Sequence, residues 1–149
     1  SLAIGIVLIF VFLLSFVACG TPNYDFDKMA KNLQETNGEE YKIEFKNDTV
    51  YITRTYTLPK SGRTREDIAN LSSKEFDDWA NGFWLIIGNE QKEYEDVFKE
   101  NGDNYDVLIT YQIIDGNGNE IGFVDINGCD FSLDDLKINK SCKTSFFIP

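Results

Sequence analysis

Residues 72–102 constrain the fold of this chain more than any other stretch. Their apolar side chains recur at the 3.6-residue period of an α-helix and fall on one side of it as a broad aromatic stripe. The stripe consists of Phe76, Trp79, Ala80, Phe83, Ile86, Ile87, Tyr94, Val97 and Phe98. Ser72 followed by Glu75 predicts a reciprocal cap at the helix start, and Asn101-Gly102 predicts its end. A helix with so wide an apolar face must cover a sheet.

Glu90 interrupts this stripe, because an unbroken helix would place its carboxylate in the middle of the apolar side. A buried carboxylate without a partner is costly. The sequence therefore favours a break at Gly88-Asn89, with Asn89 as the cap of a second helix and Glu90 in its first turn. A single long helix is the alternative.

Trp84 also departs from the stripe, since it projects from another side of the helix. Large aromatic side chains are most often core residues, which favours packing against the first helix of the chain. The alternative is that Trp84 is an exposed binding anchor.

Shorter patterns complete the expected domain. Residues 26–37 repeat apolar side chains at helical spacing and predict a short N-terminal helix. Residues 39–58 change to a period of two around Asn47-Asp48 and predict a β-hairpin, and residues 105–126 predict a second hairpin. We expect an α+β fold with an antiparallel sheet of about four strands. The aromatic helix and the short helix would cover one face, in the order helix, hairpin, helix, hairpin.

The apolar run of residues 1–18 contains no charged side chain and has the length of a secretory signal sequence. Cys19 follows it directly. The segment Phe16-Val17-Ala18-Cys19 resembles the lipobox of bacterial lipoproteins, in which the cysteine receives a diacylglyceryl group and becomes the mature N-terminus. The resemblance implies a signal peptide of residues 1–18, a tether of residues 19–24 and one domain of residues 25–149. This domain would be held on the extracytoplasmic face of the cell membrane by the lipid on Cys19.

Two features of this segment depart from the lipobox pattern. Phe16 occupies a position where an aliphatic residue is usual, and neither a basic segment nor an initiator methionine precedes the apolar run. We therefore expect that the natural precursor has further residues before Ser1. The alternatives are an uncleaved membrane anchor and a buried core helix, the latter disfavoured because the run is apolar on all sides.

The expected order of elements, together with the hairpin segment Tyr-Gln-Ile-Ile-Asp-Gly at residues 111–116, resembles a family of uncharacterised lipoprotein domains from Gram-positive bacteria. The resemblance spans roughly residues 25–126. It implies an exported α+β domain and brings no active site that would transfer to this chain.

Charge and the lack of histidine restrict the function further. The formal net charge is -11, so we expect no nucleic-acid partner. No histidine is present as a general base or metal ligand, and no GxSxG, SxxK, P-loop or HExxH motif occurs. We expect no cofactor, and a non-enzymatic module that binds an unknown protein, peptide or envelope ligand. The alternatives are an envelope hydrolase with paired carboxylates and a cation-stabilised structural domain.

One segment reverses the acidic character of the chain. Residues 49–65 contain no acid, and their four basic residues are Arg54, Lys60, Arg63 and Arg65. These side chains are a candidate patch for an anion or a partner. The alternative is that they pair with the acidic helices beside them.

A polar ridge follows one side of the second hairpin strand and consists of Tyr51, Thr53, Thr55 and Thr57. The favoured interpretation is a solvated strand surface, and a ligand-facing ridge is the alternative.

Asp115, Asn117 and Asn119 place oxygen ligands at alternate positions, as the start of a calcium-binding loop does. The following residues do not continue that pattern, so these three are only a weak metal candidate. The favoured interpretation is a hairpin loop in which Gly and Asn adopt positive φ angles.

Cys129 and Cys142 are the thiols that remain after Cys19, and in an exported domain they are a possible disulfide. Free structural cysteines are the alternative. The spacing contains no CxxC and the chain no histidine, which argues against zinc and against a catalytic cysteine.

Overall fold

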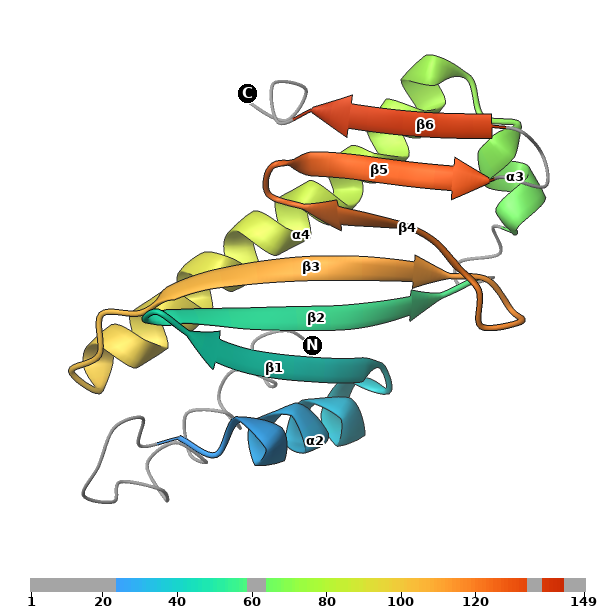
Figure 1. Cartoon of the computed structure of the whole chain (residues 1–149). Helices are drawn as coiled ribbons and strands as arrows, with labels where there is room; N and C mark the ends of the chain where they lie inside the picture. The colour runs from blue at the N-terminus through green and yellow to red at the C-terminus, as the bar shows by residue number, and fades with distance from the viewer. Residues whose placement is uncertain (1–23, 59–63, 134–137, 144–149) are drawn as a thin grey trace.

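The structure, a computed structural model, describes residues 24–58, 64–133 and 138–143, with the backbone alone for residue 133 and residues 138–143. Three helices and six strands lie in these ranges (Figure 1). The helices are α2 (Phe26–Asn37), α3 (Arg65–Ala69) and α4 (Ser73–Glu100), and the strands are β1 (Glu40–Lys46), β2 (Thr49–Thr57), β3 (Asp106–Ile114), β4 (Glu120–Asp125), β5 (Gly128–Leu133) and β6 (Ile138–Lys143).

The N-terminal apolar run and Cys19 lie outside the described residues, so the expected signal peptide and lipid anchor stay predictions. Of the helices that the structure does describe, none combines the length and the apolar character needed to cross a bilayer.

The six strands form one sheet in chain order from β1 to β6. Every neighbouring pair is antiparallel except β2 and β3, which are parallel. The parallel pair arises because α4 carries the chain back along the sheet, so that β3 begins at the same end as β2 (Figure 1). The α+β class is confirmed, but the expected sheet of about four antiparallel strands is wrong. After the helices the chain continues through four strands, because residues 128–133 and 138–143, which follow the second predicted hairpin, also pair as β5 and β6.

α4 is one continuous helix of 28 residues with the cap that the sequence predicts. The Ser72 hydroxyl accepts a hydrogen bond from the Glu75 N–H at 3.2 Å, and the Glu75 carboxylate accepts one from the Ser72 N–H at 2.8 Å. The expected break at Gly88-Asn89 is wrong, because Glu90 stays in the buried face and has a charged partner there. Ile86, expected in the stripe, is 45% exposed.

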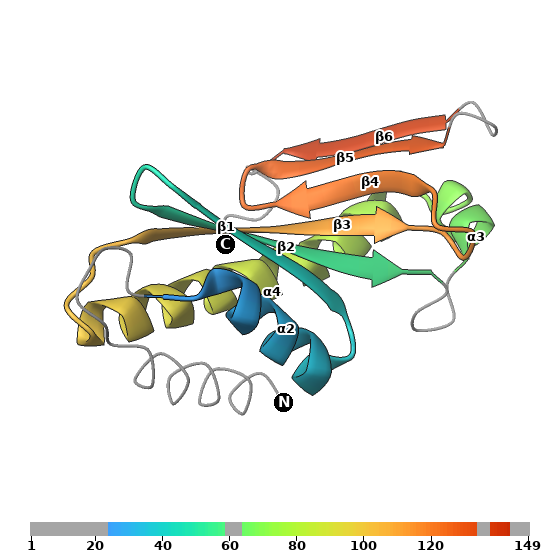
Figure 2. The same cartoon turned by 60° about the horizontal axis from the view of Figure 1, so that its bottom comes forward.

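Both α2 and α4 cover the same face of the sheet, with α2 against β1 and α4 across β3 and β4 (Figure 2). The core between helices and sheet is rich in aromatic rings. The Phe131 ring packs against Phe76 and Trp79 at centroid distances of 5.5 and 5.4 Å. Phe83 packs against Tyr111 at 5.3 Å. Within the described residues, the opposite face of the sheet carries no helix (Figure 2).

Gly122 on β4 is part of this core because its cross-strand partner, Phe131 on β5, covers it. A Cβ atom at this position would lie 2.4 Å from Cδ1 of Phe131 and 2.6 Å from the carbonyl oxygen of Asp130. Only a residue without a side chain leaves room for the ring.

Tyr24 fixes the point at which the chain enters the domain. Its ring packs against Phe98 near the end of α4 and against Tyr105 before β3, with centroids 5.3 and 6.1 Å apart. Its hydroxyl donates a hydrogen bond to the Asp103 carboxylate. The start of the described chain is therefore held beside the C-terminal end of α4.

Candidate functional site

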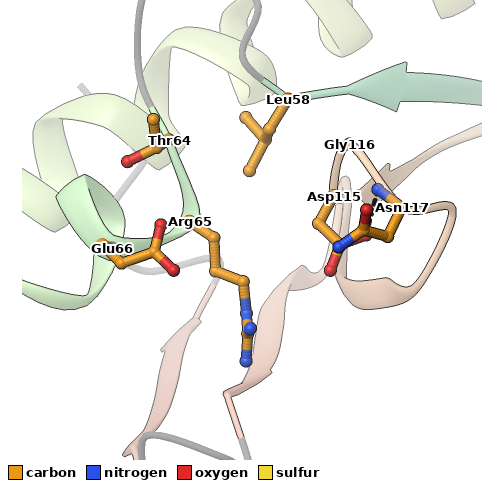
Figure 3. Close-up of a pocket in the computed structure, with 7 residues that line it drawn as sticks. All are labelled: Leu58, Thr64, Arg65, Glu66, Asp115, Gly116 and Asn117. Atoms are coloured by element: carbon orange, nitrogen blue, oxygen red, sulfur yellow. Dashed lines mark hydrogen bonds between the residues drawn. The ribbon is translucent and has the colours of Figure 1, made fainter.

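A small pocket of about 190 Å³ lies between the start of α3 and the β3–β4 loop (Figure 3). It is lined by Leu58, Thr64, Arg65, Glu66, Asp115, Gly116 and Asn117. The Thr64 hydroxyl caps α3 by accepting a hydrogen bond from the Asp67 N–H at 3.2 Å. This cap places Arg65 in the first turn, and its side chain extends into the space between the two elements (Figure 3).

Asp115 organises the β3–β4 loop through its carboxylate. Oδ1 accepts hydrogen bonds from the backbone N–H groups of Asn117 and Asn119, both at 2.9 Å, and Oδ2 accepts one from Nδ2 of Asn119 at 3.3 Å. These hydrogen bonds, that of the Asn119 backbone first, and the charge of Arg65 hold the pKa of Asp115 below its ordinary value.

These contacts favour a hairpin loop over a cation site at Asp115, Asn117 and Asn119, because the Asp115 oxygens already accept the amides of the loop. Within the described ranges, no three His, Cys, Asp or Glu side chains gather as a metal site. Gly118 has the positive φ angle of this loop, 84°, whereas neither asparagine does.

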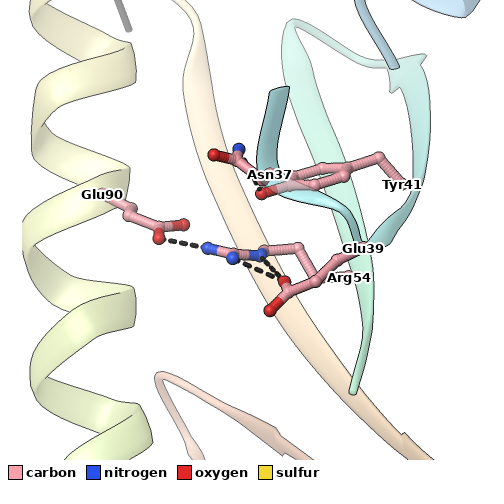
Figure 4. A network of polar contacts seen from close by, with 5 residues as sticks. All are labelled: Asn37, Glu39, Tyr41, Arg54 and Glu90. Atoms are coloured by element: carbon pink, nitrogen blue, oxygen red, sulfur yellow. Dashed lines mark hydrogen bonds and ion pairs between the residues drawn. The ribbon is translucent and has the colours of Figure 1, made fainter. Parts of the chain in front are cut away.

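Arg54 on β2 is the centre of a buried polar network (Figure 4). Its Nε and Nη2 donate to Oε2 of Glu39 at 3.0 and 2.6 Å, and its Nη1 donates to Oε1 of Glu90 on α4. Arg54 is 9% exposed and Glu90 is 1% exposed. Beside them, Asn37 at the end of α2 donates from Nδ2 to the Tyr41 hydroxyl at 3.0 Å. The network therefore links α2, β1, β2 and α4.

Strand register places Arg54 between two tyrosines. Tyr41 on β1 and Tyr111 on β3 are its direct cross-strand partners. The central carbon of the guanidinium lies 5.0 Å from the Tyr41 ring centroid and 4.7 Å from that of Tyr111. Aromatic faces attract cations. Two aromatic rings and two carboxylates therefore hold this guanidinium in place.

Opposite effects of burial and charge act on the pKa values of this network. Burial alone would lower the pKa of Arg54, but Glu90, the two tyrosines and Glu39 raise it above its ordinary value. Burial raises the pKa of Glu90, and Arg54 opposes that shift. Burial also raises the pKa of Tyr41, to about 12. Arg54 therefore stays cationic, and its charge counteracts the rise that burial causes in the pKa of Glu90.

The basic patch predicted from Arg54, Lys60, Arg63 and Arg65 is wrong for Arg54, which is buried and pairs with Glu39 and Glu90. Pairing with an acidic helix, the alternative, holds for this residue. Lys60 and Arg63 lie outside the described residues, and Arg65 lines the pocket beside Asp115.

Trp84 is half-buried and packs against the core, so it is not an exposed binding anchor. Its Nε1 donates a hydrogen bond to the carbonyl oxygen of Ile126, in the β4–β5 turn, at 3.3 Å. It thus attaches α4 to the sheet, whereas the sequence favoured packing against the first helix.

Cys129 on β5 is buried and disulfide-bonded. Cys142 on β6 is its direct cross-strand partner in the backbone register, although the Cys142 side chain lies outside the described atoms. The pairing of Cys129 with Cys142 stays a prediction that this register supports.

The open face of the sheet, opposite α2 and α4, carries large hydrophobic residues. Tyr51, Leu108 and Phe123 are 40, 37 and 38% exposed. Tyr51 lies beside Leu108 across the parallel β2–β3 pair, and Phe123 lies between Gln112 of β3 and Asp130 of β5. The strand centres between them carry half-buried polar residues, namely Thr53, Thr55, Thr110 and Gln112.

A hollow of about 290 Å³ lies around Phe123 on this face. It is lined by Glu120, Ile121, Gly122, Phe123, Asp130 and Ser132. A wider hollow of about 690 Å³ lies at the β1–β2 end and is lined by Glu44, Phe45, Lys46 and Tyr51. The open face therefore combines exposed aromatic and aliphatic side chains with polar ones, and it is a candidate for contact with another molecule.

Sequence reasoning missed both the Arg54–Glu90 pair and the exposure of Phe123. Two opposite charges at positions that face the core, one on a strand and one on a helix, were the signal for the pair. The position of Phe123 depends on a register shift in β3 between Ile113 and Ile114, which has no local sequence signature.

No protein-family model, no curated protein and no solved structure matches this chain.

Proposed function

We propose that this chain is a lipid-anchored, non-enzymatic interaction module on the extracytoplasmic face of a bacterial cell membrane, and that it binds a partner through the open face of its sheet. The observation that carries the proposal is the asymmetry of the sheet. Helices α2 and α4 seal one face, whereas the other keeps Tyr51, Leu108 and Phe123 at 37–40% exposure. Contiguous exposed apolar residues are typical of interaction sites, and on this face Tyr51 and Leu108 are direct cross-strand neighbours.

The position of Tyr24 determines which part of the domain would lie nearest to a lipid on Cys19. The chain from Cys19 to Tyr24 spans at most about 18 Å when fully extended. Tyr24 is held against Phe98 and Tyr105. A lipid on Cys19 would therefore keep the C-terminal end of α4 close to the bilayer.

The buried carboxylates of Glu39 and Glu90 do not provide the catalytic pair that the hydrolase alternative needs. A glycosidase needs two acids across a cleft that a substrate can enter. Glu39 and Glu90 do face each other, but the Arg54 guanidinium lies between them, and their side chains are only 11 and 1% exposed. Glu39 and Glu90 both bind Arg54, and their role is therefore structural.

Mass spectrometry of the chain expressed with a complete signal sequence in a Gram-positive host tests the anchor. We expect cleavage before Cys19, a diacylglyceryl group on its sulfur, and recovery in the membrane fraction. The Cys19→Ser variant, as the control, should remain unprocessed and unlipidated. An unmodified Cys19 in a soluble chain would contradict the anchoring proposal.

Photo-crosslinking in the same cells tests the open face. A benzophenone amino acid is placed at Leu108, and as a control at Asp96, an exposed residue of α4. We expect a crosslinked protein specific to the Leu108 position, whose binding to the purified chain is then measured. Identical products from both positions, or none from Leu108, would contradict the binding surface.

A further inference from the structure

The strands around Phe123 have a one-sided charge. Strands β3, β4 and β5 contain no lysine or arginine, and their acids are Asp106, Glu120, Asp125 and Asp130. At the β1 edge of the sheet, Lys42 pairs with Glu44 at 2.9 Å. The part of the open face formed by β3 to β5 is therefore negative and complements a positively charged partner.

Phe123 and two of these carboxylates border one hollow. Phe123 is the direct cross-strand partner of Asp130, and in such pairs the Cβ atoms are about 5 Å apart. Glu120 is held on the other side by Gln112, whose Nε2 donates to its Oε2 at 2.9 Å. Glu120, Phe123 and Asp130 all line the hollow of about 290 Å³. Within the described residues, Asp130 forms no ion pair, and the Phe123 ring packs against no other ring.

The same kinds of group hold a cation elsewhere in this chain. In the core, the Arg54 guanidinium lies against the rings of Tyr41 and Tyr111 and pairs with the carboxylates of Glu39 and Glu90. The hollow on the open face has an aromatic ring and two carboxylates without a basic side chain of the described chain among its lining residues. An arginine or lysine from outside would complete it by a cation–π contact and an ion pair.

We propose that the occupant of the open face is a basic segment of a protein partner, and that one arginine or lysine of this segment enters the hollow between Phe123, Glu120 and Asp130. This inference rests on the proposed function and names the chemistry of the partner. A segment rather than a single small cation is favoured because Leu108 lies four residues from Gln112 along β3, about 13 Å away. That exposed leucine would contact an apolar residue of the same segment.

Binding of a defined peptide to the full chain in neutral detergent tests the proposal. The probe is the fluorescein-labelled heptapeptide Gly-Arg-Ser-Arg-Ser-Leu-Gly, whose first arginine and leucine lie four residues apart and on the same side of an extended chain, and the control peptide has glutamate at both arginine positions. We expect only the basic peptide to bind, with an affinity that falls as salt is raised. In NMR spectra of the chain, addition of this peptide should change the amide chemical shifts most strongly around Gln112, Phe123 and Asp130.

Three variants identify the hollow. Asp130→Asn and Phe123→Thr should each weaken the basic peptide about two- to fivefold, the range expected for one exposed ion pair or cation–π contact. Asp96→Asn removes the same charge from α4 and should change the affinity by less than about 1.5-fold. Thermal unfolding of each variant verifies its fold, and Asp130→Asn, an exposed change, serves even if Phe123→Thr does not fold.

Three outcomes would overturn the proposal: equal binding of the acidic peptide, shift changes centred away from Phe123, or equal weakening by Asp96→Asn and Asp130→Asn. Spermine that binds the hollow as tightly as the peptide would overturn the choice of a protein partner. If Leu108 crosslinks a partner in cells while the basic peptide fails to bind, the open face remains a binding surface and only the basic partner is wrong.

Discussion

Arg54 of β2 and Glu90 of α4 form a buried ion pair that joins the middle of the sheet to the middle of the helix that covers it. The rings of Tyr41 and Tyr111 flank the guanidinium, and Glu39 binds its other edge. Removal of Arg54 leaves the buried Glu90 carboxylate without its partner, and removal of Glu90 leaves Arg54 with Glu39 alone, which makes the pair a sensitive probe of the fold.

Glu90→Ala should lower the free energy of unfolding by about 3 kcal/mol, because the buried Arg54 guanidinium loses one of its two carboxylates. Urea denaturation measures the change. Glu93→Ala, on the exposed side of the same helix, is the control and should change stability by less than about 0.5 kcal/mol. Equal changes in the free energy of unfolding for the two variants would show that the ion pair does not stabilise the contact between helix and sheet.

Gly122→Ala should destabilise the domain by about 1–3 kcal/mol, because the added Cβ would lie 2.4 Å from the Phe131 ring. Gly82→Ala on the exposed side of α4 should instead stabilise it by about 0.5–1 kcal/mol, since its Cβ meets no atom within 4 Å and alanine is the better helix former. Thermal or urea unfolding gives both signs. A stabilised Gly122→Ala variant would contradict the packing of Phe131 over β4.

Asp115→Asn should be less stable than the parent chain at neutral pH, and the difference should shrink in acid. The pKa of Asp115 is lower in the folded chain than its ordinary value of 3.8. Its carboxylate therefore contributes stability above the unfolded pKa, and this contribution is lost as the pH falls through the folded pKa. Melting temperatures between pH 7 and pH 2.5 measure the effect, with Asp96→Asn as the control. A difference independent of pH would be inconsistent with the hydrogen bonds of the loop.

A disulfide between Cys129 and Cys142 should stabilise the domain by about 3 kcal/mol in the chain-entropy model, because it closes a loop of about 14 residues. Peptide mapping without reductant should find the two cysteines linked, and reduction should lower the melting temperature. The Cys129→Ser, Cys142→Ser double variant should match the reduced parent chain. Labelling of both thiols in the unreduced, denatured chain would rule out the bond.

Local features of this fold could be predicted from the sequence, and long-range ones could not. The Ser72–Glu75 cap and the amphipathic side of α4 depend on residues a few positions apart, and both are confirmed. The expected break at Gly88-Asn89 is wrong because the partner that makes a buried Glu90 tolerable, Arg54, lies 36 positions away in the chain.

The direction of β3 relative to β2 and the exposed side of β4 could not be predicted from the sequence either. The parallel β2–β3 pair depends on the end of the sheet to which α4 returns the chain, which periodicity does not report. The alternation of β4 predicts a strand but not that Phe123 faces away from the helices. That orientation follows from the irregular register between β3 and β4. Of the candidate binding surface, the sequence predicts only the polar ridge of β2, for which a ligand-facing role is one of two interpretations.

The strand order has a kinetic consequence. In every pair except β2–β3, no helix lies between the two strands in the chain, so each half of the sheet can form through short-range contacts. The β2–β3 pair instead forms across the long connection that contains α3 and α4, and closing this loop costs the most chain entropy. Cleavage of the chain between β2 and α3 would give one fragment with β1 and β2 and another with α4 and β3 to β6. These two fragments would have to associate along the β2–β3 pair.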